Sequence, residues 1–469
     1  MRVRLLPRTS CRVTASLLLL AGLVRPVAAQ QEQCHSPRAA LLGEQITFIG
    51  QDLPPFRAAY SGSMSLVSTG DHQLSQSYGI YGGACLARHL AAYVDAEMIR
   101  GSGISHASGL AAVTNGDVLR QGSVDLGSGP YVARAFVRWT IPIGAEPAPA
   151  KPLVAAADGD RVGTEVDTIA AGMDNMPGTI SGHRVEITAG KLAATDLFDL
   201  NRYANSTRTQ FLDWVLFNNG AWDYAADTRG YSNGVAVAWI TPRWAIRAGS
   251  FQMPTFANGN VFDGDIANAR GDNVELTWTS SSHAVVRLLA YENHGRMGRY
   301  AVVDAAAGAS GTKPNIVTDD APGRIKYGFG LNAELPLADD GNTGVFARLG
   351  WDDGRTESFV FTEVDTHASA GAQISGRRWR RANDVLGIAV VGDGLSGPHR
   401  DYLVLGGNGF LLGDGTLRYG PEMLSEAYYA VQLGPHLVLS PDVMLIVHPG
   451  YNRDRGPATV LSFRLRVSN

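Results

Sequence analysis

The segment 192–231 gathers side chains that could bind a polar molecule. It mixes aromatic rings with guanidinium and carboxylate groups and has no clear hydrophobic period. Charged groups form strong hydrogen bonds with polar partners, and aromatic rings offer flat stacking surfaces. The competing interpretation is that these aromatic rings simply pack against the neighbouring structure. The candidate binding residues are Asp199, Arg202, Tyr203, Arg208, Trp214, Trp222 and Asp223.

Motifs of enzymes and metal sites are missing from the rest of the sequence. It contains no G-x-S-x-G, H-E-x-x-H or C-x-x-C pattern, and the pair Gly190-Lys191 lacks the other residues of a phosphate-binding loop. Residues 260–273 resemble a calcium loop, but their acidic residues do not follow its spacing. We therefore predict no catalytic residue, no metal and no cofactor, and a hydrolase is the least favoured alternative.

The elements that must position segment 192–231 are strands with one apolar and one polar face. Near the C terminus, Leu461, Phe463 and Leu465 alternate with Ser462 and Arg464. This period of two recurs along the chain, and charged residues take the face opposite the apolar one. The charges predicted on this second face are Asp95, Glu97, Arg134, Arg138, Arg184, Glu186, Arg247, Glu275, Arg287 and Arg348.

The N terminus has the form of a secretion signal. Residues 1–29 contain basic residues, then a short apolar core, then V-A-A as a small-residue cleavage site. Five of the 40 basic residues and none of the 44 acidic residues lie there, so the mature chain would carry a formal charge of −9. This acidic balance argues against a nucleic-acid partner. No later apolar stretch approaches the roughly 18 residues of a spanning helix.

A closed barrel explains the alternation better than a sandwich does. The apolar face carries Trp or Tyr near strand ends, as in membrane-interface girdles, and one pattern continues without a second kind of domain. We predict an all-β fold: a closed antiparallel transmembrane β-barrel of about 16 strands with short periplasmic turns, long outer loops and an inward-folded constriction loop. The predicted divisions are a signal peptide at 1–29, a periplasmic lead-in at 30–74 and the barrel at 75–469, with the constriction candidate at 192–231.

Two cysteines remain after removal of the signal, which takes Cys11 with it. In an oxidising periplasm, Cys34 and Cys85 could form a disulfide that ties the N-terminal segment to an early strand. Two buried free thiols are the alternative.

Several sequence pieces together resemble the OprB-like carbohydrate-selective porins of Gram-negative outer membranes. They include F-D-L-N-R-Y-A-N (198–205), R-L-G-W-D-D-G-R-T-E-S-F (348–359) and H-P-G-Y-N-R-D-R-G-P (448–457). Along the chain, these pieces keep the order that they have in the family. The resemblance covers nearly all of the mature chain. Two departures are His448 where Asn is expected and a terminal Asn469 in place of an aromatic residue.

The resemblance implies a sixteen-stranded barrel for passive entry of glucose and related sugars. The expected location is the bacterial outer membrane, and the expected partners are small carbohydrates, outer-membrane lipid and lipopolysaccharide. A general or organic-acid porin on the same scaffold is the main alternative. Whether the protein is a monomer or a homotrimer stays open at this point.

Overall fold

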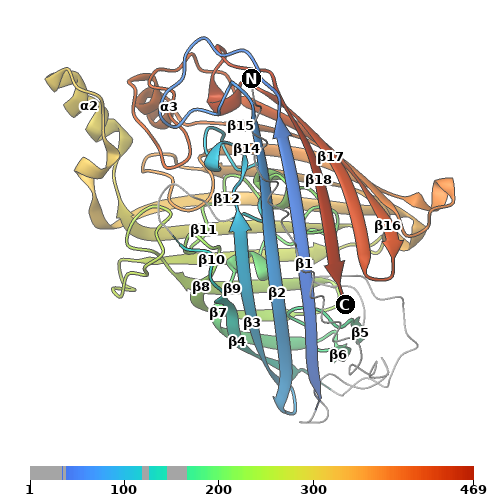
Figure 1. Ribbon diagram of the computed structural model, residues 1–469. Helices are drawn as coiled ribbons and strands as arrows, with labels where there is room; N and C mark the ends of the chain where they lie inside the picture. Colours follow the sequence, from blue (N-terminus) through green and yellow to red (C-terminus); the bar gives the residue numbers. More distant parts are fainter. Residues whose placement is uncertain (1–33, 35–38, 119–125, 145–165) are drawn as a thin grey trace, which may run out of the picture.

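The computed structural model describes residues 34, 39–118, 126–144 and 166–469, and it shows a closed antiparallel barrel of sixteen strands (Figure 1). The barrel closes where β1 (Ala40–Leu53) pairs with β18 (Ala458–Ser468). Their register runs from Gln45 opposite Ser468 to Asp52 opposite Leu461. The predicted fold is therefore confirmed. The predicted signal peptide, residues 1–29, lies outside the described residues.

The remaining barrel strands follow one another in chain order around the ring, whereas β5 and β6 form a separate hairpin. The bounds are β2 (Asp71–Ala87), β3 (Leu90–Gly101), β4 (Tyr131–Pro142), β5 (Val166–Ile169), β6 (Gly178–Ser181), β7 (Arg184–Leu192), β8 (Ser232–Ile240), β9 (Trp244–Gln252), β10 (Arg270–Thr279), β11 (Val285–Met297), β12 (Ala321–Ala338), β13 (Thr343–Asp352), β14 (Thr366–Ser375), β15 (Val385–Gly394), β16 (Glu422–Gly434) and β17 (Leu437–Val447).

The helices are short and lie in the connections between strands. In Figure 1, α2 projects outward beside one end of the barrel and α3 lies at the same end. None of the helices in the described part of the chain is long and apolar enough to cross a membrane. Their bounds are α1 (Trp214–Phe217), α2 (Tyr300–Ser310), α3 (Gly397–Val404), η1 (Ile104–His106), η2 (Ala194–Asp196), η3 (Ile316–Asp319), η4 (Asp339–Gly341), η5 (Gly376–Trp379) and η6 (Pro449–Tyr451).

The strand alternation places apolar side chains on the outside of the barrel and charged ones inside. Val137 is 39% exposed and Trp278 is 51% exposed, whereas Arg464 is only 2% exposed. In a soluble sandwich these apolar side chains would meet in a dry core. In a barrel they face lipid, so their exposure is the arrangement that a membrane requires.

Connections of two lengths alternate around the barrel. Turns such as 241–243 and 435–436 are short, and loops such as 193–231 and 395–421 are long. Because short turns of such barrels face the periplasm, the short-turn end is the periplasmic end. The chain enters β1 and leaves β18 at this end. The hairpin of β5 and β6, which belongs to the connection between β4 and β7, also lies there (Figure 1).

The prediction of a periplasmic lead-in at 30–74 is wrong. Residues 40–53 form the barrel strand β1, and β2 begins at Asp71, before the predicted boundary at residue 75. Inward polar residues Gln45 and Thr47 alternate with outward Ile46 and Phe48, so the period is present. The breaker pair Pro54-Pro55 directly after the strand favours a loop, and this signal conflicts with the alternation.

The period-two pattern also predicts a strand at Asp401–Gly406 and an outward-facing Ala133, and both differ from the structure. Most of Asp401–Gly406 belongs to α3 at the long-loop end, where Ser396 caps the start of the helix by accepting from His399 N. In β4 the register against β3 shifts at a β-bulge between the pairs of Arg134 and Val132. The bulge turns Ala133 inward, where it is fully buried, and leaves Val132 outside.

Cys34 and Cys85 form a disulfide across 51 residues of sequence. Cys85 lies on the inward face of β2, and both side chains are buried. The disulfide thus ties the residues before β1 to the inner wall of the barrel.

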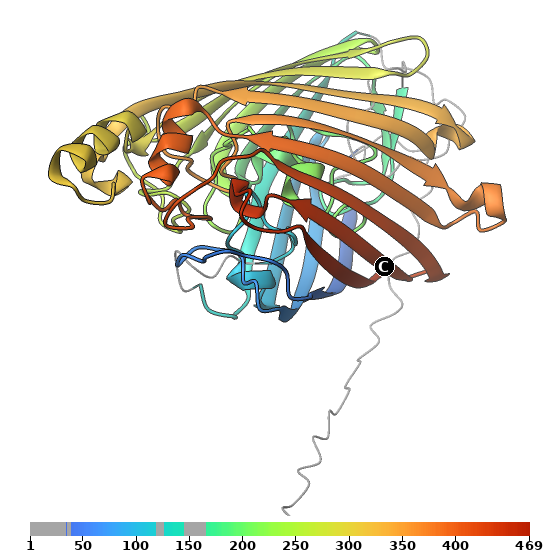
Figure 2. The ribbon, with the colours of Figure 1, turned by 90° about the horizontal axis from the view of Figure 1, so that it is seen from above.

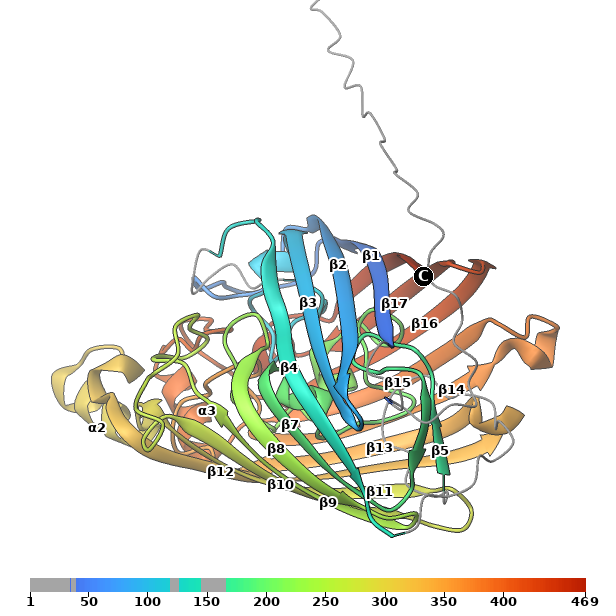
Figure 3. The same ribbon diagram turned by 90° about the horizontal axis from the view of Figure 1, so that it is seen from below.

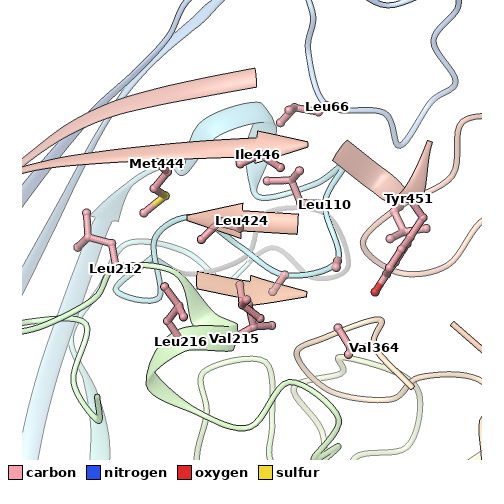
Figure 4. Close-up of a cluster of buried hydrophobic side chains, with 14 of the residues drawn as sticks. Leu66, Leu110, Leu212, Val215, Leu216, Val364, Leu424, Met444, Ile446 and Tyr451 are labelled. Carbon is pink, nitrogen blue, oxygen red and sulfur yellow. The ribbon is translucent and has the colours of Figure 1, made fainter. Parts of the chain in front are cut away.

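The lumen contains a hydrophobic core of its own. Figure 4 shows side chains from several long-loop connections against inward-facing residues of β16 and β17. Leu110, Leu212 and Val364 come from three different connections, while Leu424 and Met444 come from the wall. The long loops therefore fold back into the barrel, and Figure 2 shows loop segments within the ring of strands.

Candidate functional site

Residues 193–231, here called the lumen segment, join β7 to β8 and cross the inside of the barrel. Most of their side chains are buried. The segment contains α1, which begins after Asp213, whose side chain accepts a hydrogen bond from Val215 N at 3.1 Å. This capping bond satisfies a free amide at the start of the short helix.

Two wall arginines hold the lumen segment by its backbone carbonyls. Arg348 on β13 donates to Leu216 O at 3.0 Å and to Ala204 O at 2.7 Å. Arg464 on β18 donates to Thr207 O at 2.7 Å and Gln210 O at 2.6 Å. In the ring, β13 lies five strands from β8, β18 lies five strands from β13, and β7 lies five strands from β18. The segment is thus fixed at three evenly spaced points on the wall.

Asp199 is an anchor and is almost fully buried, at 2% exposed. Its carboxylate pairs with Arg348 Nε at 2.9 Å and accepts from Asn332 Nδ2 at 2.7 Å and Asn219 N at 2.8 Å. Its own amide donates to Glu275 on β10 at 2.8 Å. All these partners belong to the protein, so Asp199 positions the lumen segment and is not free to bind a solute.

Asp223 has a similar structural role at the other end of the segment. It accepts hydrogen bonds from Phe359 N and Val360 N, both at 2.8 Å, and lies 3.3 Å from Lys326 Nζ. Phe359 and Val360 belong to the connection 353–365 between β13 and β14. Asp223 therefore joins two inward-folded connections to each other and to β12.

Two of the three candidate aromatic rings are buried by protein. Tyr203 is fully buried and donates from its hydroxyl to Gly341 O at 3.0 Å; burial raises the pKa of Tyr203 to about 12. Trp222 is 2% exposed and donates from Nε1 to Asn273 Oδ1 at 3.0 Å. Trp214 is partly exposed and stacks on Phe361 with ring centroids 4.5 Å apart. Trp214 is thus the candidate ring that solvent reaches most.

The two candidate arginines keep partial exposure. Arg202 donates from its amide to Glu334 Oε2 at 2.7 Å and from its guanidinium to Asp340 O at 3.2 Å. Arg208 pairs with Glu97 at 2.7 Å and Asp117 at 2.8 Å. Burial raises the pKa of Asp117 although Arg208 opposes this effect. Arg208 pairs with two carboxylates, whereas the guanidinium of Arg202 donates to one carbonyl, Asp340 O, among the residues that the structure describes.

All ten charged residues predicted on the inner face do point inward, but most are covered by the connections that fold into the barrel. Arg138 and Glu186 are partly exposed, and the other eight are buried. The covered charges pair with one another or hold inserted segments, as Arg247 pairs with Glu275 at 3.6 Å and Arg287 with Glu334 at 3.5 Å. Buried charges need such partners, so these residues build the wall of a narrowed lumen.

Sequence reasoning missed several residues that position the segment. Asn332 binds Asp199, and Glu426 accepts from the amides of Leu212 and Asp213. Both Asn332 and Glu426 lie on the inward face of their strands, so strand parity was the available signal. Among the residues that the structure describes, no group of three or more His, Cys, Asp or Glu side chains is arranged to hold a metal.

A buried histidine links the outer connections. His399 in α3 stacks on Tyr300 of α2, with ring centroids 4.4 Å apart. Its Nδ1 lies 3.1 Å from Asp365, and its Nε2 lies 3.4 Å from Glu363. Burial lowers the pKa of His399, but the two carboxylates more than offset this and raise it to about 9. Burial raises the pKa of Asp365, yet charged His399 lowers it to about 2.

Comparison with known proteins decides the family. The family model described as carbohydrate-selective porin, OprB family, matches residues 176–468. The chain belongs to this family. It is a carbohydrate-selective porin of the outer membrane, and its family and fold are those of a channel.

One solved structure supports the fold of this porin, and two others are more distantly similar. The high-pH structure of Pseudomonas putida OprB is 13% identical, covers 91% of this chain and 94% of its own, and superposes with a TM-score of 0.62. The low-pH structure of the same protein is 11% identical and has a TM-score of 0.44. The match covers 91% of this chain and 92% of that structure. An anion-selective porin from Comamonas acidovorans is 8% identical and has a TM-score of 0.46. The match covers 92% of this chain and 99% of that porin. A comparison with curated proteins finds no match.

Proposed function

We propose that neutral mono- and oligosaccharides diffuse passively through this porin past the lumen segment, which is its constriction. The supporting observation is the fixation of this segment at three points of the wall, which keeps it across the path. A fixed constriction can select by shape and hydrogen bonding because its contacts do not collapse when water is replaced by a solute.

Arg202 and Trp214 are the residues through which the segment would contact a sugar. Both are partly exposed. A guanidinium donates to sugar hydroxyls, and an indole ring stacks on the flat C–H face of a sugar ring. Asp199, Tyr203, Trp222 and Asp223 would act indirectly by holding the segment in place. Sugar binding has to stay weak so that the solute leaves.

The test is the block of ionic current by sugar in a planar bilayer. Millimolar sugar should reduce the current of the wild-type porin, and Trp214→Ala or Arg202→Ala should weaken this block by roughly tenfold, since one stacking or charged contact contributes about 1–2 kcal/mol. Trp239→Ala on the lipid face and Arg243→Ala in a short turn are matched controls that should leave it unchanged. Unchanged block in both lumen variants would remove the segment from the mechanism.

Two alternative functions give different results in the same system. A general or organic-acid porin would be blocked by organic anions and not by sugars. A hydrolase would turn over substrate and lose activity when one serine or histidine is replaced, whereas a pore gives no turnover. Block by sugar without turnover supports the carbohydrate path.

We also propose that residues 1–29 direct secretion and that the exposed apolar wall contacts outer-membrane lipid and lipopolysaccharide. A homotrimer is a candidate assembly. Mass analysis of the mature protein, with a start near Gln30, and native mass spectrometry in detergent test these two points.

A further inference from the structure

A second segment folds into the barrel from the opposite end. Residues 166–182, here called the second insert, belong to the connection between β4 and β7 at the short-turn end. The hairpin of β5 and β6 carries at its tip a turn in which Gly172 and Asn175 exchange backbone hydrogen bonds of 3.1 and 3.2 Å. Figure 3 shows β5 from below, at the same end as the short turns.

The tip of the second insert lies on the inward face of β1, β3 and β4. Met176 N donates to the Tyr93 hydroxyl at 3.2 Å, and Arg138 donates to Asp174 O at 2.9 Å. Gln45 Nε2 lies 3.7 Å from the sulfur of Met173. Tyr93 is only 1% exposed and Gln45 only 6%, although both point into the lumen. The insert therefore covers wall that an open pore would leave wet.

The base of the second insert is also fixed. Asp167 pairs with Arg184 of β7 at 3.0 Å. Met176 is 1% exposed and belongs to the hydrophobic cluster that contains Cys34 and Cys85. An ion pair at one side and the disulfide cluster at the other thus hold the hairpin in the lumen.

The second insert and the lumen segment meet at one wall residue. Arg134 on β4 donates two hydrogen bonds of 2.7 Å to Asp196 of the lumen segment. The same guanidinium lies 3.5 Å from the carboxylate of Asp174. The lumen segment enters the barrel from the long-loop end, and the second insert enters from the short-turn end. A solute that moves along this wall toward the periplasm would therefore pass the lumen segment first and the second insert next.

We propose that the tip of the second insert, residues 172–175, forms a second constriction of the sugar path near the periplasmic mouth and that Met173 and Asn175 set its width. This rests on the proposed passage of sugar through the barrel. Met173 and Asn175 are partly exposed, so their side chains border solvent. The family model matches residues 176–468, so the tip lies outside the matched residues.

The first test adds bulk at the tip. Met173→Cys in the mature, disulfide-intact porin is treated with a charged methanethiosulfonate reagent during single-channel recording. Conductance should fall about twofold, because a constriction dominates the resistance of a pore. Ala301→Cys on the exposed face of α2 is the matched control and should give no change. Complete modification of Met173→Cys, shown by mass, with unchanged conductance would overturn the proposal.

The second test removes bulk from the same position. Met173→Gly combined with Asn175→Gly should raise single-channel conductance, roughly 1.5-fold or more, while heat-modified mobility on a gel reports that the barrel is folded. A folded variant with wild-type conductance contradicts the proposal. The proposed sugar path and the second constriction can fail separately. If sugar does not block the current of the wild-type porin, only the sugar path is refuted. If neither change at the tip alters the conductance, only the second constriction is refuted.

Discussion

Replacing Arg348 with methionine should release the lumen segment while the barrel stays folded. Methionine fills most of the volume but removes the ion pair with Asp199 and the hydrogen bonds to Leu216 O and Ala204 O. The strand ladder of β13 is not affected, because its backbone pairs with β12 and β14. The change therefore acts on the constriction and not on the wall.

The magnitude follows from the burial of both partners. Arg348 is 0% exposed and Asp199 is 2% exposed, so solvent does not screen their interaction. Removing one partner of a buried pair costs about 3–5 kcal/mol. Asp199 keeps Asn332 and Asn219 as donors, which favours the lower end. A loss of about 3 kcal/mol shifts the docking equilibrium of the segment by roughly a hundredfold.

Limited proteolysis and single-channel recording measure this release. Arg348→Met should become cleavable within residues 193–231, and its conductance should increase. Arg243→Met, in an exposed short turn, is the control. In the double variant with Asp199→Asn, the two losses should not add, because both remove one interaction. Wild-type protease resistance and conductance in folded Arg348→Met would refute the role given to this arginine.

Three further predictions concern other parts of the molecule. The stabilisation from the His399 ion pairs should be complete below about pH 6.5, the unfolded pKa, and be lost as the pH rises through about 9. Hydrogen-exchange protection in α3, corrected for the intrinsic pH dependence of amide exchange, should therefore fall over that range. The contribution of charged Asp365 is lost only as the pH falls toward about 2. Cys85→Ser should lower the free energy of unfolding by roughly 4 kcal/mol in a chain-entropy model, measured by heat-modified gel mobility. Gly344→Ala should displace Tyr203, whose ring occupies the space of the added carbon, and weaken sugar block.

Each of these predictions has a result that contradicts it. Corrected exchange protection in α3 that stays constant from pH 6 to pH 10 would rule out a charged His399. A wild-type unfolding temperature in Cys85→Ser would show that the disulfide adds no stability. Gly434→Ala, where an added carbon meets no atom within 4 Å, is the control for Gly344→Ala, and equal behaviour of the two would exclude crowding of Tyr203.

The barrel could be predicted from sequence because each strand carries its own evidence. Outward Leu461 and Phe463 alternate with inward Ser462 and Arg464 whatever the rest of the chain does. Strand parity also placed the charged residues on the inner face. Strand parity fails where a β-bulge changes the count, as at Ala133. At β1 the proline pair that follows the strand is a loop signal and conflicts with the alternation.

The inserted segments could be located by composition but not placed. Segment 192–231 stood out because it was aromatic, charged and aperiodic. Which of its residues would be buried depends on partners far away in sequence, such as Arg348, which is 149 residues from Asp199. No local pattern encodes that contact. The same holds for the second insert, whose wall partners Tyr93 and Gln45 are distant in sequence.

The three attachment points of the lumen segment have a mechanical consequence. A ring of strands resists stretching but flattens readily when squeezed from the side, because flattening changes only its curvature. The lumen segment connects three parts of the ring: β7 and β8, β13, and β18. Flattening of the barrel would therefore have to lengthen or break the charged hydrogen bonds of Arg348 and Arg464. The cross-section of the barrel should therefore stay round under lateral pressure from the bilayer.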